Sequence, residues 1–292
     1  MASMKTGILA VASHYESGGQ RAEALLDDAV NALRKKSVDT VVGDKVVWDA
    51  ADAIDVCKQF KDAQVDSLTI ILSTWVTDSL LYVLVHEVQV PVVFWAVPYT
   101  ETFSIGCVQH FGSVLTAHGI PYEYVYGLAD DAAVVEKVVK VAQAGNVIKR
   151  VQNMKLALVG PRQTWLVAGP QDTTNEEWEF SQKFGVTLVH IEMEEILEAA
   201  GAVSDHEASQ TLKCLKKRTG KILAAPETML RMTKVYLAVK RIAKRYSLDA
   251  LAAECYPLYS GLMNLPSSWL ADEGLILDTE GDIGHTMVMY IL

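Results

Sequence analysis

The sequence predicts an α/β protein built from two doubly wound, mostly parallel domains of the Rossmann or flavodoxin type. Three observations predict this fold class. Short apolar runs without polar alternation recur along the chain, as in parallel strands that are covered on both faces. Segments of helical length separate these runs, which is the pattern of right-handed βαβ units. The pattern restarts near residue 153, and 292 residues, half of them apolar, suit about two domains.

The first predicted domain covers residues 1–152. A strand at 7–12 leads into a polar loop at 13–19 and then into a helix near 21–33. The loop contains only Gly18 and Gly19 and matches neither GxGxxG nor GxxxxGK[ST], so a nucleotide-binding fingerprint is absent. Further strands are expected at 67–72, 90–96 and 122–126, and further helices at 50–61, 78–88, 103–118 and 132–151.

The second predicted domain covers residues 153–292. Strands are expected at 154–159, 186–191, 250–253 and 275–277. A long helix begins at Pro226, since proline is preorganised for the first helical turn. Its apolar positions alternate threes and fours, which predicts a buried stripe rather than a cofactor site. Glu192, Glu194 and Glu195 are interpreted as a solvated acidic helix start.

Charge and composition exclude several classes of protein. The formal net charge of −10 disfavours nucleic-acid binding, because phosphate contacts need clustered Lys and Arg. No apolar stretch reaches the roughly 20 residues that span a membrane, and no signal peptide follows Met1. The four cysteines are widely spaced and form no CxxC pair, which favours free thiols in a reducing compartment. We therefore expect a cytoplasmic protein without a membrane partner.

Carboxylates follow two of the strands expected in the second domain. Glu254 comes directly after the run at 250–253, and Glu280 comes shortly after the run at 275–277. Ligands bind where parallel strands end in an open α/β sheet, so the two side chains are expected to face one crevice. Gly281 allows a tight turn, and Asp282 can cap the helix that follows. The alternative is that Asp282 is only a cap and that both glutamates are simply solvated.

Three further residues are weaker candidates for substrate binding. His14 lies in the loop after the first strand and is interpreted either as a ligand contact or as a hydrogen-bonded loop histidine. Trp75 ends the strand at 67–72 beside hydroxyl side chains, where it could stack on a sugar ring or simply pack. Arg162 follows the strand at 154–159, where a cation could hold a carboxylate or a sugar hydroxyl, or could be solvated.

The C-terminal residues carry a family resemblance. The run PSSWLADEG at 266–274, followed by TEGD at 279–282, resembles the second-domain signature of the L-fucose/L-arabinose isomerase family. The resemblance is specific over 250–292 and covers the rest of the chain loosely, through domain order and lengths. It implies an aldose–ketose isomerase that acts on a monosaccharide through an enediol and depends on Mn²⁺, or alternatively Mg²⁺.

The same resemblance implies roles for particular residues. Glu280 matches the family glutamate that is both a metal ligand and a candidate acid/base. Asp282 matches the last motif position and supports the site, while Glu254 aligns less well and is kept as a site-lining residue. Trp75 stands where family members carry a tryptophan in their first domain. Family members also form hexamers, so we expect a homo-oligomer.

The chain also departs from the family pattern. It stops at Leu292, before the positions of the family's second metal carboxylate and its histidine ligand, so the second domain looks truncated and the third looks missing. His285 is a less favoured substitute ligand. A non-catalytic sugar-binding protein or an assembly module with the same two domains is the alternative function.

Overall fold

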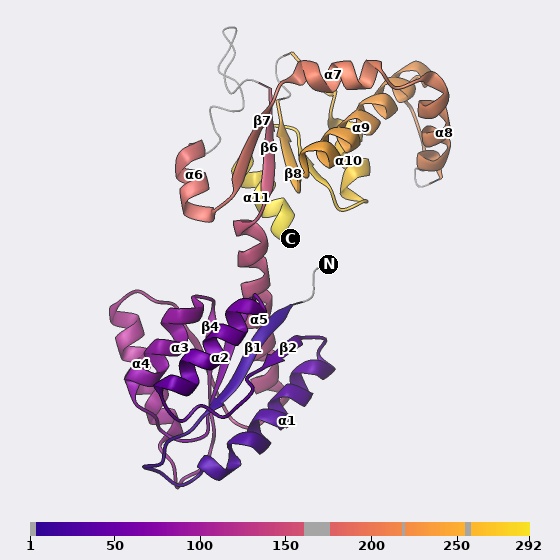
Figure 1. Cartoon of the computed structure of the whole chain (residues 1–292). Helices are drawn as coiled ribbons and strands as arrows, with labels where there is room; N and C mark the ends of the chain where they lie inside the picture. The colour runs from indigo at the N-terminus through magenta and orange to yellow at the C-terminus, as the bar shows by residue number, and fades with distance from the viewer. Residues whose placement is uncertain (1–3, 161–175, 218–219, 255–257) are drawn as a thin grey trace. The chain divides into compact units, whose positions relative to one another are not determined.

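The computed structural model describes residues 4–160, 176–217, 220–254 and 258–292. The chain forms two compact units, Met1–Lys149 and Arg150–Leu292, each with its own sheet. Every strand pair in both sheets is parallel, which confirms the expected α/β class. Figure 1 shows each sheet with helices on both of its faces.

The sheet of the first unit has the strand order β2-β1-β3-β4-β5, the flavodoxin-like order. Four strands were expected, and β2 was not, because its four residues give a weak apolar signal. The strands are β1 (Lys5–Val11), β2 (Asp39–Val42), β3 (Ser67–Leu72), β4 (Val92–Ala96) and β5 (Glu123–Tyr126). All six residues of β3 are buried, as expected for a central strand covered on both faces.

Helices cover both faces of this first sheet. One core joins one set of alternating strand side chains to α2 (Ala50–Asp62), α3 (Asp78–Val88) and α4 (Ser104–Ala117). A second core joins the opposite set to α1 (Ala22–Lys35) and α5 (Ala132–Gln152). Because successive strand residues point to opposite faces, a continuous apolar run such as β3 supplies both cores.

The second unit repeats this design with four strands in the order β7-β6-β8-β9. The strands are β6 (Lys155–Val159), β7 (Thr187–Ile191), β8 (Ala250–Ala253) and β9 (Ile276–Asp278). One face of this second sheet packs against four helices: α7 (Met193–Gly201), α8 (Asp205–Lys216), α9 (Pro226–Tyr246) and α10 (Asn264–Ala271). On the other face α11 (Ile283–Ile291) packs on β8 and β9, and α6 (Glu177–Phe184) packs on β7.

Local geometry defines the ends of two helices of the second unit, and it confirms the expected start of the long helix at Pro226. Pro226 is the first residue of α9, whose buried side chains include Met229, Met232 and Tyr236. Gly185 ends α6 with a left-handed backbone at φ 76°. Cys57, Cys107 and Cys214 are free thiols, and no helix of the described residues combines the length and apolar composition that crossing a bilayer requires.

Candidate functional site

The strand order places a crevice at the C-terminal edge of the second sheet. β6 and β8 are neighbours, with β7 beside β6 and β9 beside β8. The connections that leave β6 and β8 therefore run in opposite directions, which opens the sheet edge between these two strands. Gly160 follows the last residue of β6, and Glu254 follows the last residue of β8.

Glu254 lies buried at this point of the sheet edge, directly after β8. Its backbone N–H donates to the carbonyl of Val159 at 2.8 Å, which extends the parallel ladder by one residue. The side chain is 0% exposed, and neither carboxyl oxygen has a hydrogen-bond partner among the described residues. The side chain covers Gly160, where an added Cβ would stand 2.8 Å from Oε2. Gly160 thus leaves the room that Glu254 occupies, and the solvated interpretation of Glu254 is wrong.

The electrostatic surroundings favour the neutral form of Glu254. Burial raises the pKa of the Glu254 carboxyl, and the negative charge of Glu194 raises it further. Burial also raises the pKa of Tyr259, with contributions from the charges of Glu194 and Glu254 and from a hydrogen bond to Glu194. Glu194 is exposed in the first turn of α7, as expected, and its charge also acts on Glu254 and Tyr259.

Glu280 stands on the neighbouring tip, with a different environment. Asp278, the last residue of β9, is 4% exposed. Its Oδ2 accepts from the backbone N–H groups of Glu280 at 2.9 Å and Asp282 at 3.0 Å. Gly281 takes the left-handed conformation at φ 71°, as the turn requires. This turn leaves the Glu280 side chain exposed to solvent.

The register relates the two glutamates. Ala252 of β8 pairs with Asp278 of β9, so Glu254 and Glu280 each lie two residues beyond a paired position. One carboxyl is buried and the other is exposed. The two carboxyls therefore differ in their access to solvent, and the expectation that they face one crevice stays a prediction.

Asp282 and His285 complete this turn. Asp282 caps α11, since its Oδ1 accepts from the backbone N–H of His285 at 2.9 Å. The His285 Nδ1 lies 3.3 Å from Oδ1 of Asp278. Asp278 was not among the expected site residues, although an acidic residue just before the TEGD run is the signal that could have indicated it.

One exposed side chain at this sheet edge offers the type of ligand atom that a hard divalent cation prefers. Carboxylate oxygen is the ligand type that Mn²⁺ and Mg²⁺ prefer, and the exposed Glu280 offers it. Within the described ranges, no group of three or more His, Cys, Asp or Glu side chains could hold a metal ion. A metal at this sheet edge stays a prediction that rests on the family resemblance.

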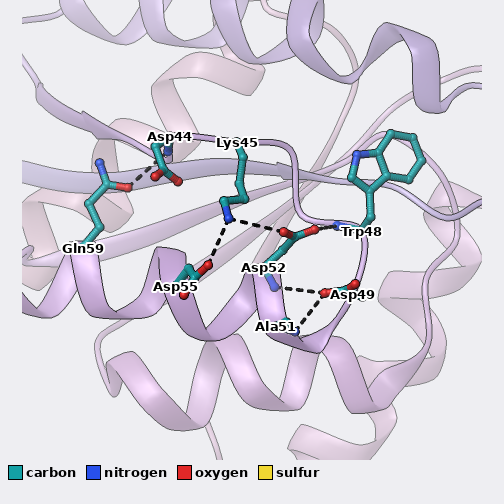
Figure 2. A network of polar contacts seen from close by, with 8 residues as sticks. All are labelled: Asp44, Lys45, Trp48, Asp49, Ala51, Asp52, Asp55 and Gln59. Carbon is teal, nitrogen blue, oxygen red and sulfur yellow. Dashed lines mark hydrogen bonds and ion pairs between the residues drawn. The ribbon is translucent and has the colours of Figure 1, made fainter.

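In the first unit, His14 lies on an aromatic stack. Its ring is 4.4 Å from the ring of Trp48 at an interplanar angle of 6°. Figure 2 shows the polar network behind Trp48: Asp52 accepts from the Trp48 backbone N–H, and Lys45 joins Asp52 to Asp55. Neither the partner of His14 nor this network was expected from the sequence.

Trp75 belongs to a second, adjoining arrangement at the C-terminal edge of the first sheet. Its side chain is half-buried and packs against the core on the α2–α4 face, so packing accounts for it. Its backbone N–H donates to Oε2 of Glu16 at 2.8 Å. The same oxygen accepts from the Thr102 hydroxyl at 2.6 Å and from the Phe103 N–H at 3.1 Å. Glu16 thus joins the loops after β1, β3 and β4.

Arg162, the remaining candidate, lies outside the described residues. The structure therefore places five of the six expected residues: Glu254, Glu280 and Asp282 in the second unit, and His14 and Trp75 in the first.

Comparisons with known proteins point to sugar isomerases. No family model matches the chain. A sulfoquinovose isomerase of Priestia aryabhattai is 21% identical over 281 residues, which cover 93% of this chain and 62% of that protein. The protein of the same name from Alkalicoccus urumqiensis is 20% identical over 251 residues, or 82% of this chain and 56% of that protein. The chain thus spans about three fifths of the length of these relatives.

Among solved structures, a periplasmic solute-binding protein of Actinobacillus succinogenes with bound D-allose is 10% identical and has a TM-score of 0.26. The alignment covers 98% of this chain and 88% of that one. A periplasmic sugar-binding protein of Legionella pneumophila gives 11% identity and the same TM-score, over 98% and 91% of the two chains. At these scores the likeness carries no argument about function.

Proposed function

We propose that this chain is part of a sugar isomerase that interconverts an aldose and a ketose. One observation carries the proposal: the turn made by Asp278 holds the Glu280 carboxylate exposed at the C-terminal edge of the second sheet. That edge is where ligands of open α/β sheets bind. The similarity to sulfoquinovose isomerases over 93% of the chain supports the same reaction class, and sulfoquinovose is the first substrate to test.

The reaction needs a group that moves a proton between neighbouring carbon atoms of the open-chain sugar. A carboxylate can take the proton from the carbon next to the carbonyl and return it to the former carbonyl carbon through an enediol. Glu280 is exposed and suits this role. Asp278 and Asp282 act as positioning residues, because they fix the turn that carries Glu280.

A divalent cation belongs to the proposal. When bound, Mn²⁺ or Mg²⁺ would stabilise the negative charge that develops on the two adjacent sugar oxygens. Glu280 would be one of its ligands, as the family resemblance implies. Glu254 is buried beside Glu194 and Tyr259, so its place in the proposal is to line the crevice.

Replacing Glu280 with Gln tests the proposal. The variant removes the proton-accepting oxygen and keeps the size of the side chain, so we expect aldose-to-ketose turnover in the presence of Mn²⁺ to fall about a hundredfold or more. Glu198→Gln is the matched control, since Glu198 is also an exposed glutamate of this unit and has no partner among the described residues. Unchanged turnover in Glu280→Gln would refute the role. Sugar binding that is independent of metal, without turnover, would instead favour a non-catalytic sugar-binding protein.

A further inference from the structure

A pocket of about 610 Å³ lies in the second unit, apart from Glu280 and the β9–α11 turn. Its walls come from α7, from the segment before α9, from the first two turns of α9, and from the connection between β8 and α10. Small-molecule sites have volumes of roughly 300–1,000 Å³, so this pocket is large enough for a monosaccharide. Lining residues that matter for its chemistry are Lys221, Met229, Arg231, Met232, Tyr259 and Leu262.

α9 carries six basic residues, and one of them, Arg231, lines this pocket. Four of them form ion pairs: Lys234 with Asp205, Lys240 with Glu273, Arg241 with Glu207, and Arg245 with Glu195. Arg231 has no hydrogen-bonding or ionic partner among the described residues, and it lines the pocket. Lys221, in the segment that precedes the helix, also lines the pocket without a partner in the described part of the chain.

Both cations lie in a protein whose formal net charge is −10. Arg231 lies in the second turn of α9. The guanidinium group of arginine matches the planar oxygens of carboxylate and phosphate, and a sulfonate offers similar oxygens. The pocket therefore presents two cations to one ligand.

The other walls of the pocket offer apolar and aromatic surface that can contact the carbon atoms of a sugar ring. Met229 and Met232 are buried and supply apolar surface from α9. Tyr259 lines the pocket, and the charge of Glu194 raises the pKa of both Tyr259 and Glu254. Through Tyr259, the pocket adjoins the crevice that holds the buried carboxyl at the end of β8.

We propose that this pocket binds the anionic end of a monosaccharide that carries a sulfonate, phosphate or carboxylate group, with Arg231 and Lys221 holding the anion and the sugar ring directed toward Tyr259. The inference rests on the proposed function only in taking the ligand to be a sugar. Anion binding itself is separable from turnover. The three anionic groups share one chemistry at Arg231 and Lys221, and the test distinguishes them.

Titration calorimetry tests this with four sugars: sulfoquinovose, glucose 6-phosphate, glucuronate and neutral glucose. We expect the protein to bind at least one anionic sugar more tightly than glucose, and Arg231→Gln to weaken that binding about tenfold, as the loss of a charge-assisted hydrogen bond does. Lys221→Gln should have a smaller effect in the same direction. Added salt should weaken binding to the unmodified protein more than binding to Arg231→Gln.

Lys244→Gln is the matched control. Lys244 is exposed on the same helix, has no partner among the described residues and does not line the pocket, so its replacement should leave every affinity unchanged. Thermal unfolding of each variant confirms that it is folded. The proposal is overturned if no anionic sugar binds, if glucose binds as tightly as the anionic sugars, or if Arg231→Gln and Lys244→Gln bind alike.

The two proposals fail in different ways. If anionic sugars bind through Arg231 but no isomerisation occurs, the pocket stands and the isomerase function is refuted. If Glu280→Gln abolishes turnover while Arg231→Gln leaves every affinity intact, the isomerase function stands and the anion pocket is refuted.

Discussion

Glu254 combines full burial with two carboxyl oxygens that have no hydrogen-bond partner in the described part of the chain. An ionised carboxylate in such a place carries a large desolvation cost, so the group shifts its pKa upward and takes a proton instead. Gly160 allows this burial because it has no side chain at the point that Glu254 covers. The pair therefore places a buried carboxyl with a raised pKa at the C-terminal ends of β6 and β8.

Glu254→Gln should change how stability depends on pH. The ordinary pKa of 4.5 is raised in the folded protein, so the unfolded chain releases this proton first as the pH rises. The unfolding free energy of the unmodified protein should therefore fall as the pH rises from that value through the raised pKa. The glutamine variant should lack this decrease. A tenfold difference in proton affinity between the folded and unfolded chains corresponds to about 1.4 kcal/mol of unfolding free energy.

Urea unfolding of both proteins across a pH series measures this difference. A parallel pH dependence in the two proteins would show that folding does not raise the pKa of Glu254, contrary to our interpretation.

Gly160→Ala should destabilise the protein for two reasons. The backbone of Gly160 is left-handed at φ 88°, and a Cβ there would meet Oε2 of Glu254 at 2.8 Å and its Cβ at 2.9 Å. Left-handed strain alone costs about 1–2 kcal/mol, and the steric clash adds to it. Gly274→Ala is the control, because Gly274 has φ 81° and an added Cβ would meet nothing within 4 Å.

Chemical denaturation compares the two glycine variants. We expect the loss of unfolding free energy to be larger for Gly160→Ala than for Gly274→Ala. Equal losses would show that Glu254 moves away at no cost and that the close approach is unimportant.

At the scale of elements, the loops after the strands of the first sheet depend on one carboxylate. Burial of Glu16 acts to raise its pKa, but hydrogen bonds from Thr102 and from the backbone of Trp75 and Phe103 outweigh it and hold the pKa below the ordinary value. Because these donors belong to the loops after β3 and β4, the ionised form of Glu16 holds three loops together.

Glu16→Ala should destabilise the protein by about 1–2 kcal/mol, because it leaves those donors without their acceptor. The contribution of Glu16 is complete above its ordinary pKa of 4.5 and is lost as the pH falls through the lower folded value. The effect of Glu16→Ala, measured by urea unfolding, should therefore shrink in acid. Glu16→Gln should cost less, since its amide oxygen can still accept from Trp75 and Thr102. An effect of Glu16→Ala that stays constant into acid would contradict this explanation.

At the scale of the whole molecule, two units share one doubly wound design, and the proposed isomerase groups all lie in the second. The chain spans 62% of the sulfoquinovose isomerase of Priestia aryabhattai. The isomerase activity of that complete protein is therefore only proposed for this chain. The homo-oligomer, the cytoplasmic location and the metal remain predictions that rest on the sequence and on the family resemblance.

The sequence by itself determined the α/β class and most of the elements. Continuous apolar runs and proline or glycine at helix ends are local signals, and they identified strands such as β3 and the start of α9. It also indicated Glu254, Glu280 and Asp282, because a carboxylate just after an apolar run lies at a strand end whatever the surrounding fold. The short strand β2 was missed, since four residues carry little periodicity.

Only the tertiary structure decided what these residues do to one another. The burial of Glu254 depends on Gly160, which is 94 positions earlier in the chain, and its pKa depends on Glu194 of another loop. The stack of His14 on Trp48 and the bridge made by Glu16 likewise join loops that are distant in sequence. Burial, pKa and hydrogen bonding are set by neighbours in space, and strand order alone determines which neighbours meet.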